Sequence, residues 1–93
     1  MKPADVFKAL ADPSRRRMLE LLQGGSMTAG ELGSHFEFSA PSVSHHLAAL
    51  RSAELVRTER RGQNVVYTLN TTVLEDVSRF VLDLLGVAEK ESP

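Results

Sequence analysis

The stretch TAGELGSHFEFSAPSVSHHLAALRS, residues 28–52, carries the signals of two short helices joined by a tight connection. Thr28 and Glu31 have the spacing of a capping box, in which each side chain bonds to the backbone N–H of the other residue. This pair predicts a helix over residues 29–35. A second cap follows so soon that little chain is left between the two helices.

The second helix of the pair starts after Ser39, its N-cap candidate, and has Pro41 in its first turn, where a missing N–H costs nothing. Only residues 36–39 separate the two helices, and helices joined this closely form a helix-turn-helix. At about 100° per residue, the apolar side chains of the second helix fall on one side. They are Val43, Leu47 and Leu50. This side is predicted to be buried.

The opposite side of this helix consists of small residues, hydroxyls and one imidazole. Small side chains allow close approach to a DNA groove, and Ser and His both donate to and accept from base edges and phosphates. The candidate DNA contacts on this helix are Ser39, Pro41, Ser42, Ser44 and His45. The plainer alternatives are a capping role alone for Ser39 and an idle exposed side chain for His45. We expect His46 to be half-buried and hydrogen-bonded near the core.

Cap and turn residues divide the rest of the chain into further elements. We expect helices over residues 4–10, 13–23 and 73–88, with Asp12 capping the second and Thr71 or Thr72 the last, and strands over residues 55–60 and 65–70. The connection Arg-Gly-Gln-Asn predicts a hairpin, because Gly and Asn tolerate positive φ. The expected fold class is mostly α with a β-hairpin wing (α+β). Its order is four helices, the hairpin and a last helix, in one domain over residues 1–93 with a frayed tail at 89–93.

The hairpin turn is rich in cations. Beside a DNA-reading helix it resembles a wing, whose side chains follow phosphates or enter the minor groove. The candidates are Arg60, Arg61, Gln63 and Asn64. The alternative is an ordinary solvated turn. For the run Arg15-Arg16-Arg17, contact with phosphate and pairing with acids such as Asp12 and Glu20 both stay open.

The last helix is apolar over an arc of roughly 160°, which is wider than so small a domain buries by itself. A second copy of the chain would cover the remaining apolar surface if the first and last helices of the two copies packed against each other. The predicted dimer interface consists of Val6, Phe7, Leu10, Leu74, Val77, Phe80, Val81, Leu84 and Leu85. The alternative is a monomer whose own core buries all the apolar side chains of the last helix.

Length and composition restrict the class of protein. Ninety-three residues, 42% of them hydrophobic and 25% charged, fit one domain. The chain has no Cys, which excludes disulfides, thiolate metal sites and thiol nucleophiles. Without an export signal or an apolar stretch long enough for a membrane span, we expect a cytoplasmic protein without membrane insertion. No catalytic motif is found, so we do not expect an enzyme.

The formal net charge of −1 is a cancellation between regions. Residues 39–70 hold four Lys or Arg against two acids, whereas residues 71–93 hold five acids against two bases. This distribution allows the middle of the chain to meet phosphate while the acidic C-terminal segment stays away from it.

Four segments resemble, in order and spacing, the ArsR/SmtB family of bacterial winged helix-turn-helix repressors. They are LADPSRRR (residues 10–17), TAGEL (28–32), SAPSVSHHL (39–47) and RGQNVVYTL (61–69). The resemblance covers about residues 5–85. It implies a homodimer, built on the first and last helices, that binds double-stranded operator DNA through the fourth helix and the wing. It further implies that Pro41, Ser42, Ser44 and His45 face the major groove.

The sequence departs from the metal-sensing members of that family. Many of them carry Cys in the third helix, which here reads ELGSH, and others use His on the last helix, which here offers only acids. The chain resembles a small metal-independent branch, so we expect no metal site and no cofactor. The leading hypothesis is a repressor acting on an inverted-repeat operator. The alternatives are the same repressor controlled by a non-thiol metal site or a protein antagonist, and a protein-interaction module on a winged-helix scaffold.

Overall fold

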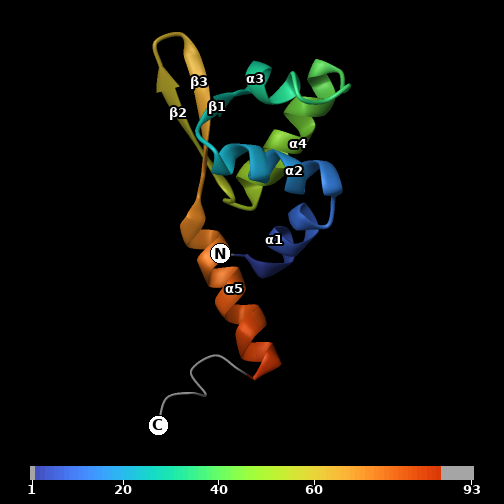
Figure 1. Cartoon of the computed structure of the whole chain (residues 1–93), viewed down its shortest axis with the longest axis vertical. Coiled ribbons are helices and arrows are strands. Elements are labelled where there is room, and N and C mark those ends of the chain that lie inside the picture. Colours follow the sequence, from blue (N-terminus) through green and yellow to red (C-terminus); the bar gives the residue numbers. More distant parts are fainter. Residues whose placement is uncertain (1, 87–93) are drawn as a thin grey trace.

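The computed structural model describes residues 2–86, which form five helices and three strands. Their order is α1 (Pro3–Leu10), α2 (Pro13–Gln23), β1 (Met27–Thr28), α3 (Ala29–Gly33), α4 (Ala40–Ser52), β2 (Val56–Arg61), β3 (Asn64–Leu69) and α5 (Thr71–Leu85). Helices α1 to α4 gather beside the β2–β3 hairpin, and α5 leads away from the end opposite the hairpin tip (Figure 1). The mostly helical fold with a hairpin wing, predicted from the sequence, is confirmed.

Three of the four predicted N-caps lie where the sequence placed them. The Asp12 carboxylate accepts hydrogen bonds from the backbone N–H groups of Ser14 (2.8 Å) and Arg15 (3.2 Å). Thr28 and Glu31 form both bonds of the capping box, at 3.1 and 2.8 Å. The Ser39 hydroxyl accepts from the third backbone N–H after it, at 3.3 Å. Side-chain caps therefore fix the starts of α2, α3 and α4.

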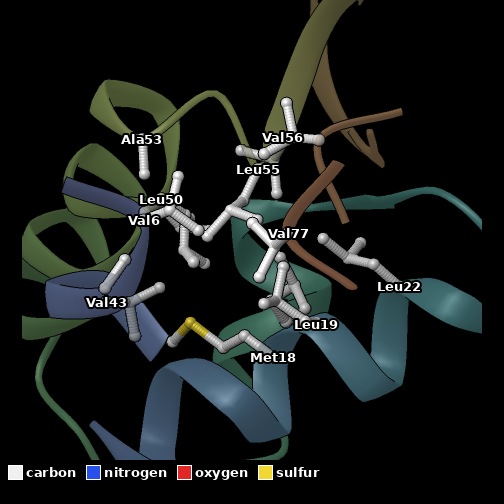
Figure 2. Close-up of a cluster of buried hydrophobic side chains, with 14 residues drawn as sticks. Val6, Met18, Leu19, Leu22, Val43, Leu50, Ala53, Leu55, Val56 and Val77 are labelled. Carbon is white, nitrogen blue, oxygen red and sulfur yellow. The ribbon is translucent and has the colours of Figure 1, made fainter. Parts of the chain in front are cut away.

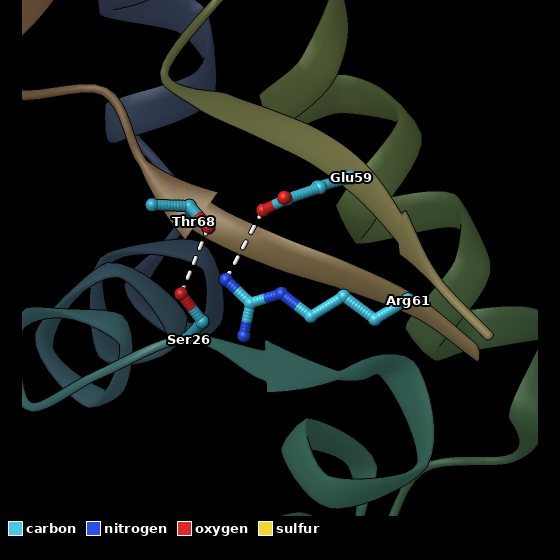
Figure 3. Close-up of polar contacts among 4 residues, drawn as sticks. All are labelled: Ser26, Glu59, Arg61 and Thr68. Carbon is cyan, nitrogen blue, oxygen red and sulfur yellow. Dashed lines mark hydrogen bonds and ion pairs between the residues drawn. The ribbon is translucent and has the colours of Figure 1, made fainter.

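The sheet has a third strand that the sequence reasoning missed. Strand β1 pairs antiparallel with β3, and the strand order is β1-β3-β2. Next to this pairing the hydroxyl oxygens of Ser26 and Thr68 are hydrogen-bonded at 2.8 Å (Figure 3). Because β1 is only two residues long, it shows no alternating pattern that periodicity could detect.

The hairpin differs from the expectation by one position in each strand. Arg61 pairs with Asn64, which leaves a two-residue loop of Gly62 and Gln63. Gly62 has φ of 62°, as the first loop residue of a type II′ turn requires, whereas Asn64 belongs to the strand and has no positive φ. The expectation that both Gly and Asn bend the chain was therefore wrong for Asn64.

The core joins all the helices to the base of the hairpin (Figure 2). Its largest fully buried side chains are Met18, Leu32, Leu47, Leu50, Leu55 and Val6. Helix α5 contributes to this core only with Val73 and Val77, near its start. The predicted apolar face of α4 is confirmed, and it holds that helix against α1, α2 and α3.

The junction between α4 and β2 is a tight turn with one residue in the left-handed conformation. Glu54 has φ of 61°, and the backbone N–H of Leu55 donates to the carbonyl of Leu50 at 3.0 Å while that of Glu54 donates to Arg51 at 2.9 Å. These bonds form a Schellman motif, whose left-handed position is usually Gly. Glu54 therefore holds a strained conformation.

Replacing Glu54 by Gly is expected to raise the free energy of unfolding by up to about 1 kcal/mol. The left-handed conformation costs a residue with a Cβ about 1–2 kcal/mol, part of which is offset by the greater freedom of Gly in the unfolded chain. Urea unfolding measures the change. Glu54→Ala is the matched control, because it removes the same carboxylate but keeps the Cβ; equal stability of the two variants would contradict the strain.

Helix α5 begins two residues earlier than expected. Its N-cap is Asn70, which makes no side-chain cap bond, so the predicted caps Thr71 and Thr72 were wrong. The Asn70 side chain instead donates to the carbonyl of Glu54 at 2.9 Å, and its backbone N–H donates to Leu55 at 2.9 Å. These contacts with the α4–β2 junction set the start of α5.

The remaining boundaries also differ slightly. Helix α3 ends at Gly33 rather than at residue 35, and α5 ends at Leu85, followed by Gly86 with φ of 75°. The predicted end of α5 at residue 88 and the predicted tail at 89–93 lie outside the described residues. Within residues 2–86, no helix is long and apolar enough to cross a membrane.

Candidate nucleic-acid interface

The start of α4 and the tip of the hairpin lie at the same end of the molecule, opposite to α5 (Figure 1). The side chains predicted to face DNA on α4 are all exposed, as are those of the wing. They are Ser39, Pro41, Ser42, Ser44 and His45 on α4, and Arg60, Arg61, Gln63 and Asn64 in the hairpin. The fold thus places the two predicted groups on one end of the chain.

Ser39 serves first as a cap. Its hydroxyl accepts from the Ser42 backbone and lies 3.3 Å from the Ser42 hydroxyl, to which it donates. Pro41 starts α4 without needing a donor, and the small residues around it leave the backbone of the first turn open. This end of α4 therefore offers hydroxyls and little bulk, which suits close approach to a groove.

The two histidines have different surroundings. His45 is exposed and borders a hollow between α1, α2 and α4. His46 is half-buried, as predicted, and its ring lies 5.4 Å from that of Phe38. The expected hydrogen bond was wrong, because the buried Nδ1 of His46 has no partner among the described residues. Its neighbours on this side are aromatic rings: Phe38 stacks on Phe36, which packs against the core.

Burial and nearby groups shift the pKa of the Asp12 carboxyl, which caps α2. Burial raises the pKa of Asp12, but two backbone N–H donors and the charges of His46 and Arg15 outweigh burial, so the pKa lies below its ordinary value. The ionised carboxylate is thus the form that the fold stabilises.

Replacing Asp12 by Ala is expected to lower the free energy of unfolding by about 1 kcal/mol near neutral pH, since α2 loses its N-cap. Because folding lowers the pKa of this carboxyl, its contribution is present above the unfolded-state pKa and is lost as the pH falls through the folded-state pKa. Urea unfolding from neutral to acid pH checks this. Asp12→Asn, which keeps an acceptor without charge, should lose less stability; a cost of Asp12→Ala that stays constant into acid would contradict the assignment.

The two wing arginines are not equivalent. The Arg61 guanidinium lies 3.1 Å from the Glu59 carboxylate on the same strand (Figure 3). Arg60 has no ion pair within residues 2–86 and is exposed. Because neighbouring residues in a strand point to opposite faces, Arg60 extends from the other face of the hairpin.

The arginine run of α2 has a role other than the two that the sequence left open, contact with phosphate and pairing with acids. Arg15 Nε donates to the carbonyl of Ala9 at 3.1 Å, and Arg16 Nη1 donates to that of Leu10 at 2.7 Å. Both carbonyls belong to the last turn of α1, where cations and donors are favourable. Arg17 pairs with Glu20 at 3.4 Å on the exposed surface, as the acid-pairing alternative expected. Two of the three arginines therefore hold α1 against α2.

The residues predicted for a dimer interface divide into three groups. Val6 and Val77 are buried in the core, which leaves them little or no surface for a partner. Leu10 and Leu74 are half-buried, and the others are exposed, most of all Leu84 (73%) and Leu85 (68%). The rings of Phe7 and Phe80 lie 5.9 Å apart and join α1 to α5. Leu82, which was not in the predicted set, is exposed as well.

No three His, Asp or Glu side chains come together as metal ligands within residues 2–86. His35 on the turn after α3 is exposed. The acids of α5 likewise form no such group with residues of other described elements.

Comparison with known proteins gives consistent matches. Residues 12–58 match the model of "bacterial regulatory protein, arsR family". The transcriptional repressor SdpR of Bacillus subtilis is 47% identical over 94% of this chain and 97% of its own length. The arsenical resistance operon repressor of Staphylococcus xylosus is 38% identical over 91% of this chain and 81% of its own. A solved ArsR family transcriptional regulator superposes with a TM-score of 0.86 at 26% identity, covering 98% of this chain and all of that one.

Proposed function

The chain belongs to the arsR family of bacterial regulatory proteins, and on this basis we propose that it is a repressor that binds operator DNA as a homodimer. One observation carries the proposal: the exposed hydroxyl and imidazole face of α4 and the cationic hairpin tip lie together at one end of the molecule (Figure 1). Helix α4 would enter the major groove, and the hairpin would follow the adjacent backbone. Both relatives named above are repressors.

The charge distribution supports this orientation. Strands β2 and β3 carry Arg57, Arg60 and Arg61 against one acid, whereas α5 carries Glu75, Asp76 and Asp83 against one base. Phosphates attract the first region and repel the second. DNA is therefore favoured at the end of the molecule that presents α4 and the hairpin.

The exposed apolar surface of α5 supports the dimer. The exposed Leu84 and Leu85 share α5 with Phe80, whose ring lies near that of Phe7, and a second copy would cover these apolar side chains. A two-fold dimer presents two α4 helices, so its operator would be an inverted repeat with half-site centres about one helical turn apart.

Selection of bound fragments from random duplex DNA tests the proposal directly. We expect enrichment of an inverted repeat with half-sites about 10 base pairs apart. A library that stays random after repeated rounds at moderate salt would contradict a repressor and favour the protein-interaction module. The selected DNA sequence is then used as the operator in measurements of binding affinity.

The unequal wing arginines lead to a second expected result. Arg60→Gln should weaken operator binding more than Arg61→Gln, because Arg61 is already partly neutralised by Glu59. Loss of one phosphate contact also lowers the slope of log affinity against log salt by about 1. Fluorescence anisotropy at several salt concentrations measures both quantities. If the two variants lose equal affinity and slope, the ion pair does not affect DNA binding.

We further propose that repression does not depend on a metal ion. The sequence has no Cys, so the thiolates that thiophilic metals prefer are missing. Titration of zinc, nickel and copper into the protein–operator complex should leave its affinity unchanged. A metal-dependent release of the operator would favour the alternative of a non-thiol metal site.

A further inference from the structure

A hollow of about 380 Å³ lies between α1, α2 and α4, beside the proposed DNA-binding surface. Its walls include Asp5, Lys8 and Ala9 of α1, Arg15 of α2, and His45 and Ala49 of α4. Small-molecule sites typically occupy roughly 300–1,000 Å³, so the hollow has room for a small ligand. It opens on a different side of α1 from Phe7, because Asp5 and Lys8 lie about 160° and 100° from Phe7 around the helix.

The charged groups around the hollow are not paired with one another. Within residues 2–86, no ion pair joins Lys8, Arg15 and Asp5. Arg15 uses its Nε for the carbonyl of Ala9, which fixes the guanidinium and leaves its Nη donors for another acceptor. A guanidinium held in this way presents a planar fork that matches a carboxylate.

Apart from His45, the other side chains of the wall are small. The side chains of Ala9 and Ala49 are methyl groups, and Ser52 has one hydroxyl. The hollow therefore combines two cations, one carboxylate and two small apolar side chains. A molecule with a carboxylate, an ammonium group and a short aliphatic body matches these features in charge and size.

We propose that this hollow binds a free amino acid, with its carboxylate on Lys8 and Arg15 and its ammonium group on Asp5, and that this ligand weakens operator binding. The expected effect on operator binding rests on the proposed function, in which His45 contacts DNA. Because His45 also lines the hollow, a bound ligand restrains the imidazole away from the groove. Linkage requires that the operator weaken binding of the amino acid by the same factor.

Titration of the ¹⁵N-labelled full chain tests ligand binding without DNA. The probes are the protein amino acids and 4-aminobutyrate, each added to about 10 mM, where even a Kd near 1 mM gives near-saturation. We expect saturable shifts of the amides around Ala9 and Ala49 for at least one probe. No saturable shift with any probe would overturn the proposal. Inorganic phosphate is the parallel arm, and equal affinity for phosphate would show a plain anion site and overturn the zwitterion assignment.

Matched variants locate the ligand. Lys8→Gln and Asp5→Asn should each weaken binding of the amino acid about tenfold, since each removes a charge-assisted hydrogen bond. Arg17→Gln is the control for Lys8→Gln, because it removes the same charge from the exposed surface of α2 away from the hollow. All three positions are exposed, so the folded state is retained. An affinity that falls equally with Arg17→Gln would place the ligand elsewhere.

The effect of the amino acid on operator affinity is measured separately, with the selected operator. A saturating amino acid should lower operator affinity at least about fivefold, which is the low end of typical coupling between sites. Unchanged operator affinity in the presence of a bound amino acid would overturn the coupling through His45. If no operator is selected at all, the repressor proposal fails, whereas the titration without DNA still decides whether the hollow binds an amino acid.

Discussion

Replacing Ser44 and His45 together by Ala is expected to weaken binding to the selected operator at least about 30-fold. Both side chains are exposed on α4, at the end of the molecule that also presents the hairpin (Figure 1). A well-placed side-chain contact with a base contributes about 1–3 kcal/mol, so losing two lowers the affinity by roughly 30-fold to 10⁴-fold. Fluorescence anisotropy with labelled operator at one fixed salt concentration measures the loss.

The fold does not depend on these two side chains, since neither belongs to the core. Circular dichroism and the oligomeric state of the double variant should therefore match the unmodified protein. Gln23→Ala is the control, because it truncates an exposed polar residue at the end of α2, outside the proposed interface. Operator affinity that stays the same in the double variant would show that this face of α4 does not read DNA.

Replacing Leu84 and Leu85 by Glu is expected to convert the proposed dimer into a monomer. These are the most exposed large apolar side chains of the described residues, at 73% and 68%. A carboxylate buried without a partner in an apolar interface costs several kcal/mol, so two of them should raise the dimer dissociation constant at least about a hundredfold. Sedimentation equilibrium over a range of concentrations measures this constant.

The monomer should also lose operator affinity, because each chain then binds only one half-site. Arg79→Glu is the control: it also adds negative charge to α5, but on the polar side of the helix, and breaks only an exposed ion pair at 4.0 Å. Its oligomeric state should not change. A double variant that remains dimeric would place the interface elsewhere on the chain.

The sequence predicted local features of the fold well and long-range ones poorly. Caps such as Asp12 and Ser39 depend on backbone groups two or three residues away, so their spacing is visible in the sequence. Strand β1 depends on a partner strand about 40 residues later. The start of α5 likewise depends on the bond from Asn70 to Glu54. No pattern within a short window contains either partner.

In the candidate DNA-binding site, too, features set by nearby residues were predictable and features set by distant residues were not. Helical periodicity was sufficient to place Ser44 and His45 on the exposed side of α4. It could not show that Arg15 and Arg16 bond to carbonyls six residues earlier in another helix. Nor could it show that His46 lacks a hydrogen bond, because that depends on which groups of other elements surround the ring.

The bonds from Arg15 and Arg16 to the end of α1 also bear on the order in which the chain folds. A helix of eight residues is too short to be stable alone in water. Helix α1 leaves the ribosome before α2, yet the two guanidinium groups that hold its last turn belong to α2. We therefore expect α1 to become ordered only after α2 has formed, although α1 is synthesised before it.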